Sequence, residues 1–288
     1  MRLGFIGLGV MGAPMATNLL DAGHTLRIHR ENARTPQLVE AGAALAPTPA
    51  AATDGAEAIL LMLPDTPDVD AVLHGPDGVL AGLADGALVI DMSSISPVAT
   101  EQFAAEVVAA GGQYVDATVS GGEVGAREGT LTIFVGGEDD AVERARPLLE
   151  TLGGRITHMG PAGAGQATKV VNQIIVGLTI EAVAEGLALA EASGIDPETV
   201  RAALDGGFAT SRILELHGRR MAERSFDPGF RLRLHRKDLR LAQDSAAHRG
   251  LALPGLETVA AQMDEALDRQ WQELDHSALF RLLAEDSR

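Results

Sequence analysis

A glycine-rich turn near the start of the chain limits most strongly what this sequence can fold into. The apolar run Leu3–Ile6 leads directly into Gly7-Leu8-Gly9-Val10-Met11-Gly12, which fits the pattern G-x-G-x-x-G, and residues with helical spacing follow from Pro14. A strand, this turn and a helix in succession are the context in which the pattern binds a dinucleotide. The first glycine permits the tight turn, the second lets the backbone approach the pyrophosphate, and the third lets the helix pack closely. We therefore expect all six residues of the turn to contact a dinucleotide cofactor: Gly7, Leu8, Gly9, Val10, Met11 and Gly12.

Strand-like and helix-like segments alternate through the first half of the chain, and only helical segments follow. Alternation of this kind is typical of a parallel sheet covered by helices. Residues 166–192 contain no proline and carry an apolar stripe at helical spacing, so they predict one long helix. We expect an α/β Rossmann-type N-terminal domain (1–161) and an all-α C-terminal domain (162–288), joined by a long interdomain helix. Further strands are expected at Thr25–Ile28, Ala58–Leu63, Ala87–Asp91, Gln113–Asp116 and Thr130–Val135.

The charge and the lack of cysteine exclude several classes of function. Of the 288 residues, 23 are Lys or Arg and 40 are Asp or Glu, which gives a formal net charge of −17. So acidic a chain repels nucleic acids and anionic membranes. The absence of cysteine excludes disulfides and thiolate metal sites and is consistent with the cytoplasm. We expect no metal, because the histidines lack paired ligand spacing, and no transmembrane helix, because no run of about 18 uncharged apolar residues occurs.

The residues after the second expected strand bear on the choice of coenzyme. Arg30 lies 18 positions after Gly12, where an arginine accommodates the 2′-phosphate of NADP and an acidic residue binds the ribose of NAD. Arg30 therefore favours NADP, with Arg34 as a helper. NAD stays open, because the adjacent Glu31 can accept the ribose hydroxyl. A third possibility is that Arg30 is a solvated turn residue.

Lys169 falls in the first turn of the expected long helix, after Gly163 and Gly165. The helix dipole disfavours a cation there and lowers its pKa, which suits a proton donor near neutral pH. Asn172 lies one turn on and shares its face. Ser120, with the amides of Gly121 and Gly122, is a candidate nest for a carboxylate after another strand. The alternative for Lys169 is a solvated surface lysine, and the alternative for Ser120–Gly122 is an ordinary glycine turn between strands.

Five segments together resemble the β-hydroxyacid dehydrogenase family, 3-hydroxyisobutyrate dehydrogenase and its relatives, in order over nearly the whole chain. Within the family, the chain is most similar to the tartronate semialdehyde reductases. Three segments carry this similarity: Gly121–Glu123, Lys169–Val176 and Phe226–Arg231 with His235. The five segments are Gly4–Gly12, Asp91–Pro97, Asp116–Gly122, Gly163–Gln173 and Lys237–Leu239.

The resemblance implies a role for each matching residue. It makes Lys169 the catalytic acid/base and Asn172 its neighbour, with Lys237 bordering both coenzyme and substrate. It assigns the substrate carboxylate to Ser120, Gly121 and Gly122, and further dinucleotide contacts to Ser94, Leu63 and Pro64. Three positions depart from the family: Thr118 replaces a usual proline, Gln173 replaces a frequent asparagine, and Arg30 replaces the aspartate of related NAD-preferring reductases.

The resemblance thus implies an NAD(P)H-dependent reductase of a small 3-oxo acid, of the tartronate semialdehyde to glycerate type. The reaction is reversible and the substrate carries a carboxylate. We expect a cytoplasmic homodimer or homotetramer. A 3-hydroxyisobutyrate or other 3-hydroxyacid dehydrogenase is the first alternative. A non-catalytic dinucleotide-binding module and an imine reductase are others, and Lys169 argues against both.

Overall fold

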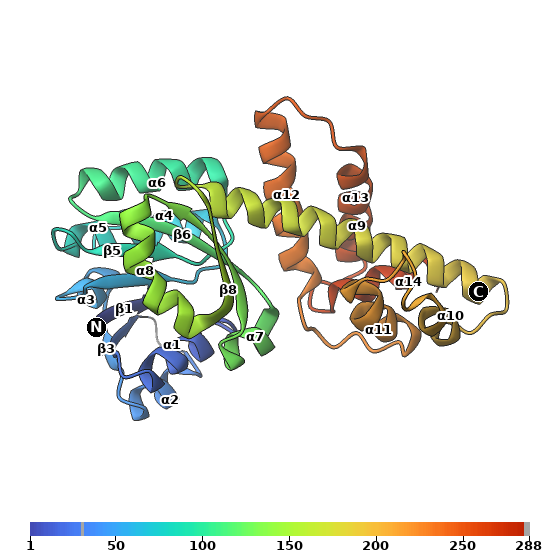
Figure 1. Ribbon diagram of the computed structural model, residues 1–288, viewed down its shortest axis with the longest axis horizontal. Coiled ribbons are helices and arrows are strands. Elements are labelled where there is room, and N and C mark those ends of the chain that lie inside the picture. Colours follow the sequence, from blue (N-terminus) through green and yellow to red (C-terminus); the bar gives the residue numbers. More distant parts are fainter. Residues whose placement is uncertain (30–31, 285–288) are drawn as a thin grey trace. The chain divides into compact units, whose positions relative to one another are not determined.

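The computed structural model describes residues 1–29 and 32–284. The chain forms two compact units, Met1–Lys169 and Val170–Arg288. The boundary expected from the sequence lies between residues 161 and 162. Helix α9 (Ala164–Ala192) begins in the first unit and continues into the second (Figure 1). An α/β unit followed by a helical unit, with one long helix between the two parts of the sequence, confirms the predicted fold class.

The first unit is built on an eight-stranded sheet of order β3-β2-β1-β4-β5-β6-β7-β8 (Figure 1). The strands are β1 (Arg2–Ile6), β2 (Thr25–His29), β3 (Ala44–Ala46), β4 (Ala58–Leu61), β5 (Leu88–Asp91), β6 (Gln113–Ser120), β7 (Leu131–Gly137) and β8 (Gly153–Gly160). The helices are α1 (Gly12–Asp21), α2 (Thr35–Glu40), α3 (Pro49–Thr53), α4 (Thr66–His74), α5 (Val79–Gly82), α6 (Pro97–Ala109), α7 (Gly122–Glu128) and α8 (Asp139–Leu152).

Two features of this sheet differ from the sequence-based expectation. The strands β3 and β8 were not expected, and β6 pairs with β7 antiparallel rather than parallel. The connection explains the second difference. Only residues 121–130 separate these strands, and a parallel crossover needs a dozen or more residues. Strand β3 has three residues, two of them exposed, and most of β8 is exposed, so neither carries a strong apolar signal.

The core of the first unit lies on both faces of the sheet, because successive strand residues point to opposite sides. On β1, Leu3 and Phe5 pack on one side with residues of α1 and α8. Ile6 packs on the other side with residues of α4 and α6. Strands buried on both faces read as continuous apolar runs, as Ala58–Leu61 does.

The second unit is helical around one core, to which Ile180, Leu239, Met263 and Phe280 contribute. Its elements after α9 are α10 (Pro197–Leu204), a π-helical segment (Leu214–Gly218), α11 (Arg219–Ala222), α12 (Leu232–His248), α13 (Pro254–Asp268), a 3-10 segment (His276–Leu279) and α14 (Phe280–Ala284).

Within the described residues, α9 is the one helix long and apolar enough to cross a membrane, with a mean hydropathy of 1.6. The sequence predicted no transmembrane helix, because the chain has no run of about 18 uncharged apolar residues. Length and composition are weak evidence, since core helices of water-soluble proteins pass the same test.

Candidate active site

The carboxyl ends of four neighbouring parallel strands, β1, β4, β5 and β6, meet at one edge of the sheet. The glycine-rich turn follows β1, the Leu63–Pro64 turn follows β4, Ser93 and Ser94 follow β5, and Ser120 ends β6. The strand order reverses direction between β1 and β4, and ligands of open α/β sheets bind at such a switch point. The sheet therefore gathers the glycine-rich turn, Leu63, Pro64 and Ser94, the described coenzyme residues predicted in the first unit, at one edge.

Each of the three glycines in the turn is explained by a different feature of the structure. Gly7 has a φ of +104°, and a Cβ there would overlap the carbonyl oxygen of Met62. A Cβ at Gly12 would overlap the carbonyl oxygen of Gly7, so α1 packs directly on the turn. Gly9 is exposed, and a Cβ there would meet nothing within 4 Å. Two glycines are thus needed by the fold, whereas the open space at Gly9 leaves room for the predicted approach of a pyrophosphate to the backbone.

Hydrogen bonds between neighbouring loops brace this edge. Ser93 Oγ accepts a hydrogen bond from the backbone N–H of Leu63 at 2.9 Å, which ties the β4 and β5 loops together. The side-chain amide of Asn32 donates to the carbonyl oxygen of Leu8 at 2.9 Å and braces the glycine-rich turn. Asn32 was not expected as a site residue from the sequence. Arg30 lies outside the described residues.

The turn after β6 carries the candidate carboxylate nest. Ser120 is half-buried, and Gly121 and Gly122 have φ values of +135° and +63°, which favour glycine. These residues lead into α7, whose first turn follows immediately. The turn therefore presents a hydroxyl and a flexible glycine backbone at the same sheet edge as the coenzyme turn.

Lys169 is the sixth residue of α9 and is 9% exposed. Because α9 begins at Ala164, Lys169 lies in its second turn rather than in the expected first turn. The start of this helix is fastened to β6. Asp116 accepts hydrogen bonds from the backbone N–H groups of Gly163 and Gln166, both at 2.8 Å. The hydroxyl of Thr118 donates to the carbonyl oxygen of Gly165 at 3.0 Å, a bond that a proline at this position does not make.

In the second unit, a chain of polar contacts connects Asn172 with Lys237. The Asn172 amide donates to Gln173 Oε1 at 2.8 Å, and the Gln173 amide donates to Asp238 Oδ2 at 2.6 Å. Lys237 Nζ lies 2.9 Å from Asp238 Oδ1. Gln173 and Asp238 are buried, so this chain fixes the orientation of both predicted site residues. From the sequence, Asp238 stands only within the segment Lys237–Leu239 and has no predicted role.

Comparison with known proteins identifies the family. Residues 2–160 match the family model described as the NAD binding domain of 6-phosphogluconate dehydrogenase. Residues 163–283 match the model described as NAD-binding of NADP-dependent 3-hydroxyisobutyrate dehydrogenase. The chain belongs to the 3-hydroxyisobutyrate dehydrogenase-related family. It is therefore an oxidoreductase that acts on a CH–OH group with a nicotinamide dinucleotide, as the sequence predicted.

Individual relatives of the family align over nearly their whole length. The 2-hydroxy-3-oxopropionate reductase of Escherichia coli is 50% identical over 283 residues, which cover 98% of this chain and 97% of that protein. The 3-hydroxyisobutyrate dehydrogenase of Pseudomonas aeruginosa is 36% identical, with 97% of both chains covered. The structure of Mycobacterium tuberculosis 3-hydroxyisobutyrate dehydrogenase with L-serine has a TM-score of 0.91, 33% identity and 98% coverage of both chains.

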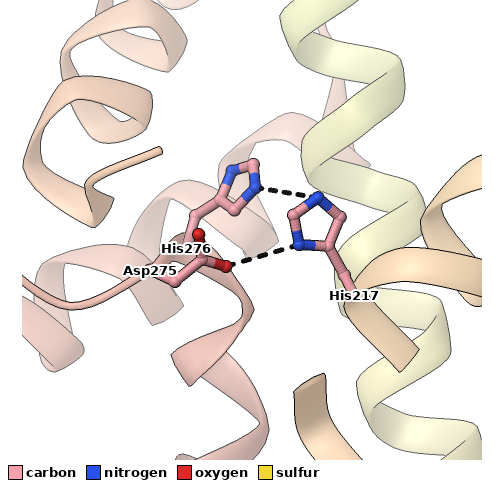
Figure 2. Close-up of side chains that lie close together, drawn as sticks. All are labelled: His217, Asp275 and His276. Carbon is pink, nitrogen blue, oxygen red and sulfur yellow. Dashed lines mark hydrogen bonds and ion pairs between the residues drawn. The ribbon is translucent and has the colours of Figure 1, made fainter. Parts of the chain in front are cut away.

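A histidine cluster that the sequence did not predict lies in the second unit, with Asp275 and His276 buried and His217 half-buried. His217, Asp275 and His276 approach one another although the first two are 58 positions apart in the sequence (Figure 2). Two imidazoles and a carboxylate are a donor set that transition metals accept. Here the Asp275 oxygens already accept hydrogen bonds from the backbone N–H groups of Gly229, Phe230 and Ser277 and from the Ser277 hydroxyl. We interpret the cluster as a structural network.

The network continues through a third imidazole to the backbone of α9. His217 and His276 are 3.3 Å apart through their Nε2 atoms, His276 and His235 are 2.8 Å apart through their Nδ1 atoms, and His235 Nε2 lies 3.1 Å from the Gln173 carbonyl oxygen. Each nitrogen–nitrogen contact accommodates one proton, so the three rings are not all charged. Burial, together with the charge of His235, holds the pKa of His276 well below its ordinary value of 6.5.

We expect acid to destabilise the protein through this cluster. A histidine whose folded pKa is depressed binds its proton only when the chain unfolds. Its stabilising effect is therefore complete above the unfolded pKa of 6.5 and is lost as the pH falls below it. Between pH 6.5 and 5.5 the loss is about 1 kcal/mol, because the unfolded histidine is already half protonated at pH 6.5. Urea unfolding at pH 7.5, 6.5 and 5.5 measures it. His276→Gln should flatten this dependence, whereas the exposed control His248→Gln should keep it. An equal slope in all three proteins would contradict the assignment.

Proposed function

We propose that this protein reduces tartronate semialdehyde (2-hydroxy-3-oxopropionate) to glycerate with NADPH or NADH, and catalyses the reverse oxidation. The observation that carries the proposal is the placement of Lys169. It is a buried lysine near the start of α9, and the start of α9 is hydrogen-bonded to Asp116 of β6, the strand that ends in the Ser120–Gly122 turn. The 50% identity to the Escherichia coli 2-hydroxy-3-oxopropionate reductase supports the choice of substrate.

Each predicted residue then has a defined task. The bound coenzyme supplies or accepts the hydride at nicotinamide C4. The Lys169 ammonium donates a hydrogen bond to the aldehyde oxygen and passes it a proton as the alkoxide develops; in the reverse direction the neutral amine takes the proton back. Ser120 and the amides of Gly121 and Gly122 hold the substrate carboxylate. Asn172 and Lys237, fixed through Gln173 and Asp238, orient the substrate.

A second candidate is a 3-hydroxyisobutyrate or other 3-hydroxyacid dehydrogenase. It is favoured by the Mycobacterium tuberculosis structure, whose backbone superposes with a TM-score of 0.91. The two candidates share the carboxylate and the reacting carbonyl, and they differ in the group at the second carbon. A hydroxyl there calls for a hydrogen-bond partner, whereas a methyl calls for an apolar contact.

A substrate panel tests the proposal. We would measure kcat/KM for tartronate semialdehyde, glycerate, 3-hydroxyisobutyrate and L-serine with both coenzymes. A site built to bind a substrate hydroxyl rejects the analogue that lacks it strongly, because its buried polar groups then stay unpaired. We expect the hydroxylated pair to be favoured over 3-hydroxyisobutyrate by at least 100-fold. A preference for 3-hydroxyisobutyrate would replace the proposed function by the second candidate.

The coenzyme preference is proposed from Arg30 in the sequence. A guanidinium pairs with a 2′-phosphate through two charged hydrogen bonds, but the adjacent Glu31 repels the phosphate. We expect a preference for NADPH of about tenfold, equivalent to about 1.4 kcal/mol. Arg30→Asp should reverse it, because aspartate accepts a hydrogen bond from the NAD ribose. The measurement is KM for NADH and NADPH in both proteins. A parent that prefers NADH, with an unchanged variant, would assign the choice to other groups.

We further propose a cytoplasmic homodimer or homotetramer. Val171, Ile175 and Leu189 on α9 are 54%, 60% and 69% exposed, and helical spacing places them on one side. Exposed apolar patches mark interaction surfaces, and a second copy of the chain is the simplest partner for this one. The absence of cysteine agrees with a reducing compartment.

A further inference from the structure

Two buried polar side chains connect the start of the lysine-bearing helix to the sheet edge, and neither has a role in the reaction as described so far. They are Asp116, in the middle of β6, and Gln166, three residues before Lys169. Both are fully buried. Side chains with a charge or an amide are rarely placed in such positions unless every polar atom is paired.

Asp116 holds the backbone of the first turn. Its Oδ1 accepts from the N–H of Gly163 and its Oδ2 accepts from the N–H of Gln166, both at 2.8 Å. The first N–H groups of a helix lack partners within the helix, so a carboxylate that bridges two of them fixes where the helix begins. Burial raises the pKa of Asp116, and the hydrogen bonds from Gly163 and Gln166 counteract that rise and stabilise the anion.

Gln166 fixes the same turn from the neighbouring strand. Its Oε1 accepts from the N–H of Ile95 at 3.0 Å, and its Nε2 donates to the carbonyl oxygen of Ser93 at 2.8 Å. These two residues flank Ser94, a predicted coenzyme contact. The helix start is thereby joined both to the strand that ends in the substrate turn and to the loop that carries the coenzyme contact.

The packing around this junction leaves no room for adjustment. A Cβ at Gly165 would lie 2.7 Å from Asp116 Oδ2 and 2.6 Å from the carbonyl oxygen of Phe134 on β7. A Cβ at Gly136, also on β7, would lie 2.5 Å from Asp116 Oδ1. Backbone from β7 and α9 thus closes on the carboxylate, and only glycine permits this approach. A displaced carboxylate would therefore move the helix start with it.

We propose that Asp116 and Gln166 are positioning residues that set the location of Lys169 relative to the coenzyme loop and the substrate turn. This inference rests on the proposed role of Lys169 as the proton donor. Neither side chain touches the reacting atoms; both act through the first turn of α9. A shift of about 1 Å in a catalytic group lowers a rate by as much as 10²-fold, so a brace of this kind is a kinetic requirement.

The test compares three variants with the parent enzyme. Asp116→Asn keeps the size of the side chain but turns one acceptor into a donor that faces a backbone N–H. Gln166→Met keeps the length and removes both hydrogen bonds. Thr168→Val is the matched control, because its hydroxyl bonds only within the helix, to the Ala164 carbonyl oxygen at 2.8 Å. Each variant is assayed for kcat, for substrate KM and for the Kd of NADPH, with kcat normalised to the titrated NADPH sites.

We expect Asp116→Asn and Gln166→Met to lower kcat by about 10- to 100-fold, with the Kd of NADPH for Asp116→Asn within about threefold of the parent. Thr168→Val should stay within about twofold in every constant. A purely structural role would instead reduce the number of NADPH sites and leave the normalised kcat unchanged, which would overturn the inference. If Asp116→Asn does not fold, Gln166→Met decides: a normalised kcat within twofold of the parent overturns the proposal.

Measurement of Lys169→Ala in parallel separates this inference from the proposed function. If Lys169→Ala keeps the parent kcat, the lysine is not the proton donor and the proposed function is wrong in its mechanism. If Lys169→Ala is inactive while both positioning variants keep their normalised kcat, the mechanism stands and the positioning role alone is wrong.

Discussion

Replacement of Lys169 by alanine is expected to lower kcat by about 10²–10⁴-fold, the usual contribution of a general acid. The ammonium supplies both the hydrogen bond that polarises the aldehyde and the proton that neutralises the alkoxide, and alanine supplies neither. Coenzyme binding should change little, because the glycine-rich turn is held by its own backbone and the loops beside it by the Leu63 N–H to Ser93 Oγ bond. Steady-state kcat with the preferred 3-oxo acid, together with the Kd of NADPH from its fluorescence, gives both quantities.

A second variant separates the charge of this residue from its proton. Lys169→Arg keeps a cation near the start of α9, but a guanidinium stays protonated at every accessible pH. We expect Lys169→Arg to bind substrate better than Lys169→Ala while its kcat stays at least 100-fold below that of the parent. A Lys169→Arg enzyme with near-parent kcat would show that the site needs a positive charge here and takes its proton from elsewhere.

The fold could be predicted to the extent that it is encoded locally. The glycine-rich turn, the buried strands and the uninterrupted helix of residues 166–192 each carry their signal within a few consecutive residues. The antiparallel pairing of β6 and β7 depends on the length of a connection, and the three-residue β3 depends on its neighbour β2 for hydrogen bonds. Neither is visible as a pattern of apolar residues, so both were missed.

The candidate site likewise contains residues that local sequence predicts and residues that depend on distant contacts. Lys169, Asn172 and the Ser120–Gly122 turn stand out because each has an unusual residue type at a defined place in a helix or turn. Asp116 and Gln166 contact partners 47 to 73 positions away, and Asp238 contacts Gln173 across 65 positions. A buried aspartate in an apolar strand is itself a signal, because burial of a charge is unfavourable unless it is paired. That signal marks Asp116 as important but does not name its partners.

The glycine-rich turn offers a prediction in which stability and coenzyme binding respond differently at two positions. A Cβ at Gly12 would overlap the carbonyl oxygen of Gly7, so Gly12→Ala must displace either α1 or the turn. We expect its free energy of unfolding to fall by about 3 kcal/mol, at the upper end for overpacking, and the Kd of NADPH to rise roughly 100-fold, about 2.7 kcal/mol.

A Cβ at Gly9 meets no atom within 4 Å, so Gly9→Ala should unfold like the parent. Its methyl group would nevertheless occupy the space through which the pyrophosphate approaches, and the Kd of NADPH should rise about tenfold. Urea unfolding without coenzyme and NADPH titration measure the two effects. Parent-like NADPH binding by Gly9→Ala would place the pyrophosphate elsewhere, and parent-like stability of Gly12→Ala would show that α1 can move away from the turn.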